Sequence, residues 1–292
     1  MKQPQGIDRS SRQLGQGAIF LCAVLWSTSG LCIKLVDWHP ILIAGARSFL
    51  AVLVLTAVKF LKPRRVKVKS RPVWVFAGGC AYASTMILFV IANKLTASAN
   101  AILLQYSAPI WAAMLGWALI KEKPHWEHWG ALVLVMAGMV LFFKDGLAGG
   151  AFLGDSIAVF SGICFGANSV FMRMLKDGDP ADAMLFAHIV TALVSIPFFF
   201  FYPPVVTAGT LLSIAFMGIF QIGVASLLFA YGIKRVPAIQ AMLTAMAEPV
   251  LNPVWVLLAT GEKPSAPAVA GGLLIVTAVA ASSLIGKRRE SD

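Results

Sequence analysis

The sequence has little charge. Only 13% of its 292 residues are Asp, Glu, Lys or Arg, whereas a soluble domain carries roughly 25%. Apolar residues make up 59% of the chain, the mean hydropathy is +0.81, and no stretch between the apolar segments is long enough for a soluble domain. A chain this apolar needs lipid as its solvent. The composition therefore predicts an all-α integral membrane protein.

Residues that form disulfides or hold metals are also scarce. The four cysteines fall inside apolar segments and the four histidines show no two-His metal spacing, so we expect free thiols, no metal site and no cofactor. The acidic residues outside the apolar segments are scattered, and Asp177 and Asp179 precede Pro180, which is better explained as the start of a helix. A membrane enzyme is therefore only a remote alternative.

The net charge is +11, which by itself would suggest a nucleic-acid partner. The Lys and Arg residues, however, lie in short loops between apolar segments, where they set membrane topology. We therefore expect a lipid bilayer and a small-molecule substrate as partners, and no nucleic acid.

Apolar runs of about 20 residues, the length that crosses the hydrocarbon core as a helix, divide the chain into ten predicted spans. Residues 183–233 carry no charge and are too long for one crossing, so Tyr202-Pro203-Pro204 is interpreted as the break between two spans. The other predicted spans are residues 16–36, 40–60, 73–93, 95–120, 128–143, 155–174, 236–261 and 266–286.

One order of residues occurs twice. Lys94, Ala101, Pro109 and Glu122-Lys123-Pro124 recur 140 residues later as Lys234, Ala241, Pro249 and Glu262-Lys263-Pro264. A unit of five spans has its second copy upside down in the bilayer, and inverted repeats of this kind build many secondary transporters around a central site. The sequence therefore predicts two inverted five-helix repeats around a central cavity.

The predicted domain boundaries follow from this repeat. They are an N-terminal tail over residues 1–15, a first repeat over 16–144, a linker over 145–153, a second repeat over 154–286 and a C-terminal tail over 287–292. With the N-terminus inside, 19 of the 24 Lys and Arg residues fall on the inner side and four on the outer side, which predicts that both termini are cytoplasmic and the linker periplasmic.

At the repeated positions the chain resembles a known family. Tyr106-Ser107-Ala108-Pro109 leading to Glu122, and Ala247-Glu248-Pro249 leading to Gly261-Glu262, resemble the two EamA-type domains of the drug/metabolite transporter superfamily. Ala46-Arg47-Ser48-Phe49-Leu50 is similar to the arginine-bearing second span of those domains. The resemblance covers residues 16–286 and is greatest to the YddG-like exporters of aromatic and other amino acids.

This resemblance implies a ten-helix carrier in which the fifth helix of each half is peripheral. It also implies export of small metabolites across the inner, cytoplasmic membrane. Glu248-Pro249 has Ala108-Pro109 as its first-half counterpart, so any chemistry of the glutamate is asymmetric.

Two charged residues are predicted to lie deep in the membrane, Arg47 and Glu248. Buried charges are rare in membranes and usually face protein or water. Glu248 belongs to a series spaced by four with Gln240, Thr244 and Asn252, which predicts one broad polar stripe on a helix. Its carboxyl is a candidate for coupling proton entry to export, and the alternative is that it satisfies backbone groups freed by neighbouring prolines.

Arg47 is a candidate for binding a substrate carboxylate bidentately. Its alternatives are to extend toward the outer interface or to bond helix-end carbonyls. His188 lies 141 residues further on and is a second candidate for proton coupling, against the alternative of a hydrogen-bonded structural histidine.

Neutral hydrogen-bonding and aromatic residues outline the rest of the predicted cavity. They suit an amphipathic zwitterion or an aromatic ring, whereas a phosphate would need more buried cations than Arg47 supplies. The alternative for each is helix–helix hydrogen bonding. The predicted substrate-binding residues, besides Gln240, Thr244 and Asn252, are Trp26, Ser29, Tyr82, Gln105, Tyr106, Phe165, Asn168, Gln221 and Tyr231.

Pro109, Pro249 and Pro253 interrupt predicted helices and are candidate hinges, because proline removes a backbone hydrogen bond. Together these features predict a secondary transporter that exports amino acids or similar small metabolites by alternating access. The alternatives are a carrier for other solutes or for cationic drugs and, more remotely, a channel or a membrane enzyme.

Overall fold

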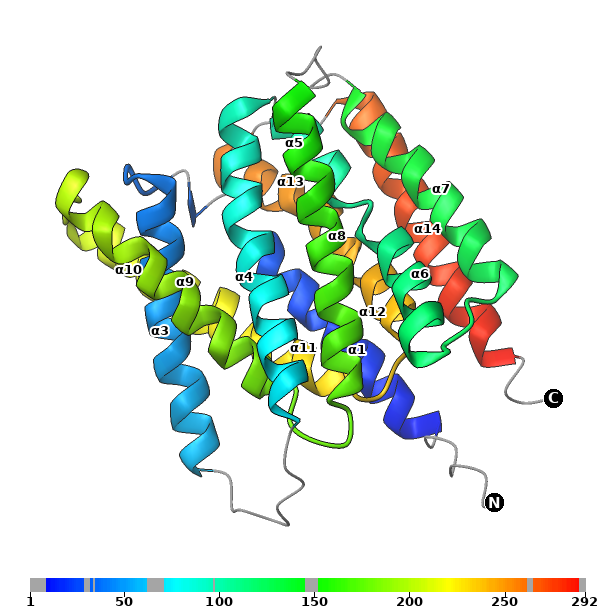
Figure 1. Cartoon of the computed structure of the whole chain (residues 1–292). Coiled ribbons are helices and arrows are strands. Elements are labelled where there is room, and N and C mark those ends of the chain that lie inside the picture. The colour runs from blue at the N-terminus through cyan, green and yellow to red at the C-terminus, as the bar shows by residue number, and fades with distance from the viewer. Residues whose placement is uncertain are drawn as a thin grey trace.

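The computed structural model describes residues 9–28, 32–33, 35–61, 71–96, 98–144, 152–261 and 265–288. Within these ranges the chain is built of helices and contains no β-strand. Figure 1 shows the long helices packed side by side, with α1 beginning and α14 ending at the same end of the bundle. The all-helical prediction is confirmed.

The helices before residue 145 are α1 (Arg9–Ser27), α3 (Pro40–Leu61), α4 (Pro72–Leu95), α5 (Ser98–Gln105), α6 (Ala108–Ile120) and α7 (Trp126–Phe142). Those after it are α8 (Phe152–Met174), α9 (Ala181–Phe201), α10 (Ala208–Phe216), the π-helix η2 (Met217–Val224), α11 (Ala225–Ile233), α12 (Ala238–Ala245), α13 (Ala247–Thr260) and α14 (Ala266–Arg288).

Six helical stretches in the described ranges are long and apolar enough to cross a membrane, and three shorter apolar helices accompany them. The predicted spans over 40–60, 73–93 and 155–174 agree with α3, α4 and α8 to within three residues. The first predicted span, over 16–36, differs because α1 begins earlier, at Arg9, and ends at Ser27. The predicted break after Phe201 is confirmed, since α9 ends there and α10 begins at Ala208.

Two of the predicted spans each consist of two helices. α5 ends at Gln105 and α12 ends at Ala245, in each case four residues before a proline, Pro109 or Pro249. Proline lacks the N–H that would bond to the carbonyl four residues earlier, and its ring clashes with that carbonyl. The two helix ends lie 140 residues apart, the spacing of the sequence repeat.

Glycines allow several helices to approach closely. A Cβ added to Gly271 of α14 would lie 2.5 Å from the Gly138 carbonyl oxygen of α7, and one added to Gly79 of α4 would lie 3.0 Å from the Ala183 carbonyl oxygen of α9. Small residues serve this purpose in membrane helices. The α7–α14 pair lies along one edge of the bundle (Figure 1).

The outer surface of the bundle carries large apolar side chains. Leu61, Phe152 and Phe200 are each more than 80% exposed, whereas Phe229 is fully buried. An exposed apolar surface of this kind marks contact with an apolar environment. It fits a bundle whose outside faces lipid.

Candidate functional site

A cavity of about 210 Å³ lies among helices that are far apart in the sequence. Its walls come from α1, α3, α4, α5 and the turn after it, α8, η2 and α13. We call this space the central cavity. Eight of the predicted site residues line it together: Trp26, Arg47, Tyr82, Gln105, Tyr106, Phe165, Gln221 and Glu248.

The central cavity occupies the half of the bundle away from the start of α1. Its wall includes Pro40, the first residue of α3, and Val90, near the end of α4. Both of these helix ends lie opposite the end at which α1 begins (Figure 1). Helices α7 and α14 contribute no lining residue among those described.

Arg47 lies in the second turn of α3 and faces η2. Its Nη1 donates a hydrogen bond to Gln221 Oε1 at 3.3 Å, and Gln221 Nε2 donates to the Trp26 carbonyl at 3.4 Å. Arg47 Nε is buried and has no acceptor among the described residues. A buried charged donor without an acceptor is costly. The guanidinium is therefore held on one side and unsatisfied on the other.

The π-helix η2 accounts for the position of Gln221. A Cβ on Gly218 would lie 3.0 Å from the Arg47 carbonyl oxygen and 2.5 Å from Leu50 Cβ, so η2 packs tightly against α3 here. π-Helical segments are rare and often occur at functional sites. The wider helical turn and the absent side chain at Gly218 together bring Gln221 next to Arg47.

Glu248 lies in the first turn of α13 on another wall of the cavity. Its carboxyl interacts with the side chain of Tyr106, in the turn between α5 and α6. No ion pair joins Glu248 to Arg47 in the described part of the chain. The two deep charges thus line one cavity without neutralising each other.

Aromatic side chains form much of the remaining wall. Trp26 packs against Phe165 at 6.1 Å and against Phe229 at 5.5 Å between ring centroids. Tyr82 meets the edge of His188 at 5.8 Å. The apolar part of the wall includes Ile43, Met86 and Phe89, which sequence reasoning missed because an apolar residue in a membrane helix gives no sign of what it faces.

A buried hydrogen-bond chain ties the cavity wall together. Gln105 Nε2 donates to Ser161 Oγ at 2.9 Å, and Ser161 Oγ donates to the Thr85 carbonyl at 3.0 Å. These residues come from α5, α8 and α4, so the two hydrogen bonds connect the part of the molecule before residue 145 with the part after it. It fixes the amide of Gln105 at the cavity.

At the opposite end of the bundle, charged groups bridge the ends of several helices, and two of them, Glu122 and Arg173, also line a hollow of about 500 Å³ there. Arg173, at the end of α8, donates from Nε to Glu122 Oε1 at 2.7 Å and from Nη1 to the carbonyls of Ile233 at 3.0 Å and Lys234 at 2.7 Å. Glu122 Oε2 accepts from the Ala238 N–H, at the start of α12, at 3.2 Å. We call Glu122, Arg173 and these three backbone groups the polar seal.

Two further contacts at this end join the two parts of the chain. Arg12 of α1 donates to Gln240 Oε1 of α12 at 2.8 Å, and Lys59 of α3 pairs with Asp182 of α9 at 2.5 Å. Sequence reasoning counted Arg12, Lys59 and Arg173 only as topology signals. Their partners lie more than 50 residues away in the sequence, and no local sequence pattern predicts these contacts.

The structure places other predicted residues away from the central cavity. Tyr231 is 39% exposed, with the Arg235 guanidinium 3.4 Å from its ring centroid. His188 is fully buried, with Nδ1 3.3 Å from Ser48 Oγ and Nε2 3.0 Å from Ser226 Oγ.

Asn168 lies on α8 between Phe165 of the cavity wall and Arg173 of the polar seal. It is 1% exposed, and neither atom of its amide has a partner among the described residues. Ser29 and the side chains of Asn252 and Pro253 lie outside the described residues. The candidate hinges Pro109 and Pro249 are both buried, next to the two helix breaks.

The predicted single polar stripe over Gln240, Thr244 and Glu248 is not present. Gln240 bonds to Arg12, Thr244 faces a different hollow between α1 and α14, and Glu248 lines the central cavity. The stripe assumed one continuous helix, but α12 ends at Ala245, four residues before Pro249, and α13 begins at Ala247.

The donor groups present do not suggest a metal centre. Within the described residues, no group of three or more His, Cys, Asp or Glu side chains is arranged to hold a metal ion. The described cysteines are free thiols. The chemistry open to the central cavity is therefore hydrogen bonding, charge pairing and aromatic contact with a bound solute.

A sequence model of the EamA-like transporter family matches residues 13–144 and, a second time, residues 152–284. The chain belongs to the EamA-like transporter family. It is a multi-pass membrane protein of transporter type, as the apolar helices indicate. The wider part of the resemblance predicted from the sequence is thereby confirmed.

Individual relatives are distant. The transporter YwfM of Bacillus subtilis is 24% identical over 273 residues, which cover 89% of this chain and 92% of that protein. Mouse solute carrier family 35 member G1 is 27% identical over 135 residues, 45% of this chain and 36% of that protein. One crystal structure matches with a TM-score of 0.80 and 23% identity, covering 96% of this chain and 99% of the other, so that likeness concerns the fold.

Proposed function

We propose that this EamA-like transporter exports amino acids or similar small metabolites across the inner membrane by alternating access. The observation that carries the proposal is the central cavity itself. Its walls come from both parts of the chain that match the family model, and the polar seal joins the same two parts at the opposite end. A carrier needs a site of this kind, reached from one side at a time.

Two inverted five-helix repeats, ten spans in all, would supply the exchangeable halves. The double match to the family model and the two helix breaks 140 residues apart support this arrangement. Rocking of one half against the other would open the polar seal and close the outer end of the cavity. The breaks near Pro109 and Pro249 are suited to act as hinges, because their freed backbone groups already lie inside the protein.

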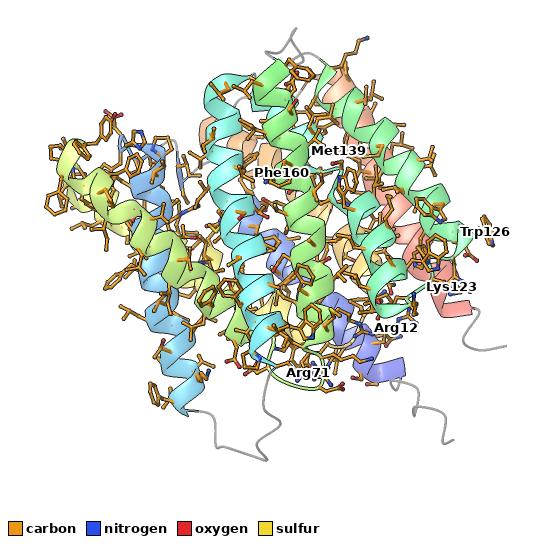
Figure 2. All side chains as sticks on the ribbon, viewed as in Figure 1. Arg12, Arg71, Lys123, Trp126, Met139 and Phe160 are labelled. Carbon is orange, nitrogen blue, oxygen red and sulfur yellow. The ribbon has the colours of Figure 1, made fainter. Side chains whose placement is uncertain are left out.

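The distribution of basic residues supports a cytoplasmic position for both termini. Arg12, Arg71 and Lys123 gather toward the end of the bundle at which α1 begins (Figure 2). Cytoplasmic ends of membrane proteins carry an excess of Lys and Arg. The central cavity would then face the periplasm in this structure, the state from which an exporter releases its substrate.

Size and chemistry favour a small amphipathic substrate. The cavity volume of about 210 Å³ is below the roughly 300–1,000 Å³ of pockets for drug-sized ligands. Its wall combines the rings of Trp26, Tyr82 and Phe165 with the amides of Gln105 and Gln221. This combination supports the similarity to YddG-like exporters of aromatic and other amino acids.

Glu248 is the residue that we propose for proton coupling. It lines the cavity beside Tyr106, with Tyr82 also on the cavity wall and Cys22 close by. His188 is less suited to this task, because both ring nitrogens already lie beside serine hydroxyls away from the cavity. Glu248→Gln keeps the size and hydrogen bonding of the side chain but cannot exchange a proton.

The decisive experiment is counterflow of labelled amino acids into proteoliposomes that contain the purified chain. Saturable counterflow above empty vesicles is the expected result and separates a carrier from a channel. An imposed proton gradient should drive accumulation by the wild type and not by Glu248→Gln, whereas counterflow by that variant should remain saturable, at a higher amino-acid concentration. If no amino acid enters above the empty-vesicle level, the proposal fails.

Efflux of cationic drugs is the second candidate. Glu248 and the aromatic wall favour it, since a carboxylate and ring faces both attract cations. Arg47, on another wall of the same cavity, opposes it by repulsion. Ethidium efflux from vesicles, competed by neither phenylalanine nor leucine, would favour this candidate over amino-acid export.

A further inference from the structure

The central cavity has charge of opposite sign on two of its walls. Arg47 contributes a guanidinium whose Nη1 is bonded to the neutral amide of Gln221 and whose Nε lacks an acceptor among the described residues. Glu248 contributes a carboxyl whose neighbour is the neutral hydroxyl of Tyr106. Within the described ranges neither charge meets an opposite charge of the protein, although both line one small space.

The side of Arg47 that is unsatisfied is suited to a carboxylate. Because Gln221 takes Nη1, the pair of nitrogens left is Nε and Nη2, which lie side by side on one edge of the planar group. That edge matches the two oxygens of a carboxylate. Gln221 is itself fixed by its bond to the Trp26 carbonyl, so it acts as a positioning residue for the guanidinium.

A singly charged solute would leave half of this arrangement unused. An amine would face Glu248 but bring no acceptor to Arg47, and a carboxylic acid would do the reverse. A phosphate ester would need more cations than the cavity offers. Ile43, Met86 and Phe89 on the wall leave room for an apolar side chain.

We infer that the central cavity binds its substrate as a zwitterion, with the carboxylate on Arg47 and the ammonium directed to Glu248 and Tyr106. The inference rests on the proposed function, because it names the substrate class and the orientation at the same cavity. The preferred substrates are α-amino acids with apolar or aromatic side chains.

The test compares four compounds that share one phenyl ring. Phenylalanine carries both the carboxylate and the ammonium, phenylalaninamide and phenethylamine lack the carboxylate, and 3-phenylpropionate lacks the ammonium. Each competes with labelled phenylalanine in counterflow, and each is also measured by its effect on the thermal stability of the purified chain in detergent. In the wild type, phenylalanine should compete at least about 10-fold better than any of the other three, since each lost charged hydrogen bond weakens binding by about that factor or more.

Variants assign each preference to one wall. Arg47→Gln should abolish the preference for phenylalanine over phenethylamine and keep the preference over 3-phenylpropionate. Glu248→Gln should keep the preference over phenethylamine and abolish the preference over 3-phenylpropionate. Arg47→Lys keeps the charge without the planar edge, so it should keep part of the preference over phenethylamine. A structural role of Arg47 would weaken binding of all four compounds by the same factor.

The outcomes separate this inference from the proposed function. Counterflow of phenylalanine with unchanged competition ratios in Arg47→Gln would overturn the zwitterion orientation and leave export of amino acids in place. Selective stabilisation by phenylalanine, lost in the expected variants but without counterflow, would keep the orientation and overturn the transport proposal. A wild type that is stabilised as well by phenethylamine as by phenylalanine would overturn the inference directly.

Discussion

The polar seal and the central cavity each contain one arginine and one glutamate, and they satisfy these charges in different ways. In the seal, Arg173 reaches the Glu122 carboxylate and two carbonyls, and Glu122 also accepts a backbone N–H. In the cavity, Arg47 has one neutral acceptor among the residues that the structure describes, and Glu248 has a neutral neighbour.

The difference follows from what surrounds each pair. The seal forms where a helix end and a helix start meet, at Ile233–Lys234 and Ala238, so backbone groups without helical partners are available to the charges. The cavity is also lined by helix ends, but the backbone carbonyl that is used there, that of Trp26 near the end of α1, accepts from Gln221 and not from Arg47. Charges there depend on other side chains or on a bound solute, which makes the seal a closure and the cavity a binding site.

Removing the arginine of the seal should have the largest effect. Arg173→Met leaves the Glu122 carboxylate and two carbonyls without their partner, and breaking a buried pair costs about 3–5 kcal/mol. Because the Glu122 side chain is 25% exposed, we expect the lower end, about 3 kcal/mol, in the free energy of unfolding measured by denaturant titration in detergent.

Lys123→Gln is the matched control, because Lys123 is exposed beside Glu122. Its free energy of unfolding should change by less than about 0.5 kcal/mol. Equal losses in the two variants would show that net charge at this end, and not the seal, determines stability.

Converting the cavity into a paired site should have the next largest effect. Gln221→Glu places a carboxylate where the amide now holds Arg47, so the guanidinium gains an ion pair and is less available to substrate. We expect stability to be maintained or raised, and counterflow of phenylalanine to fall about 10-fold. Gln221→Leu, which removes the acceptor of Arg47, should lower stability instead. Counterflow of phenylalanine at the full rate by Gln221→Glu would contradict the claim that Arg47 must be unpaired to bind substrate.

Much of this arrangement follows from local sequence signals. Pro40 and Pro72 start helices, Tyr202-Pro203-Pro204 separates two others, and Pro109 and Pro249 mark the two internal breaks. Each is a local effect of proline on backbone hydrogen bonding. Polar and aromatic residues in apolar spans also identified eight residues that share one cavity, and for the polar ones the reason is that polar groups in a membrane must face protein or water.

The remainder depends on long-range packing. No repeating pattern in the sequence predicts the π-helix that positions Gln221. Within that helix, Gly218 and Gly223 flank Gln221 and lie in close contact with α3. The pairing of Glu122 with Arg173 joins residues 51 positions apart at helix ends. Glu and Arg residues suit a loop equally well, so only the packing of α8 against α6 brings the two side chains together.

Asn168, on α8 between the central cavity and the polar seal, offers a test with a smaller expected effect. Its buried amide has no partner among the described residues, and such a group is destabilising where it stands. Asn168→Leu should therefore raise the free energy of unfolding by about 1 kcal/mol. If the amide binds water or substrate when the seal opens, the same variant should slow counterflow.

Asn168→Asp provides the contrast, because it buries a charge at the same place and should destabilise. Loss of stability in both variants would show that the shape of the side chain matters more than its unsatisfied amide. Increased stability with an unchanged transport rate would remove Asn168 from the transport path.

The contact between Lys59 and Asp182 should have the smallest effect, although it joins the same two parts of the chain as the polar seal. The Lys59 side chain is 55% exposed, so water and salt weaken the attraction. Lys59→Gln should lower the free energy of unfolding by about 0.5 kcal/mol at low salt and by less at high salt. Denaturant titrations of Lys59→Gln and Arg173→Met at both salt concentrations would compare the two pairs. A salt-independent loss as large as that of Arg173→Met would mean that closure is shared along this end of the bundle and is not concentrated at Glu122.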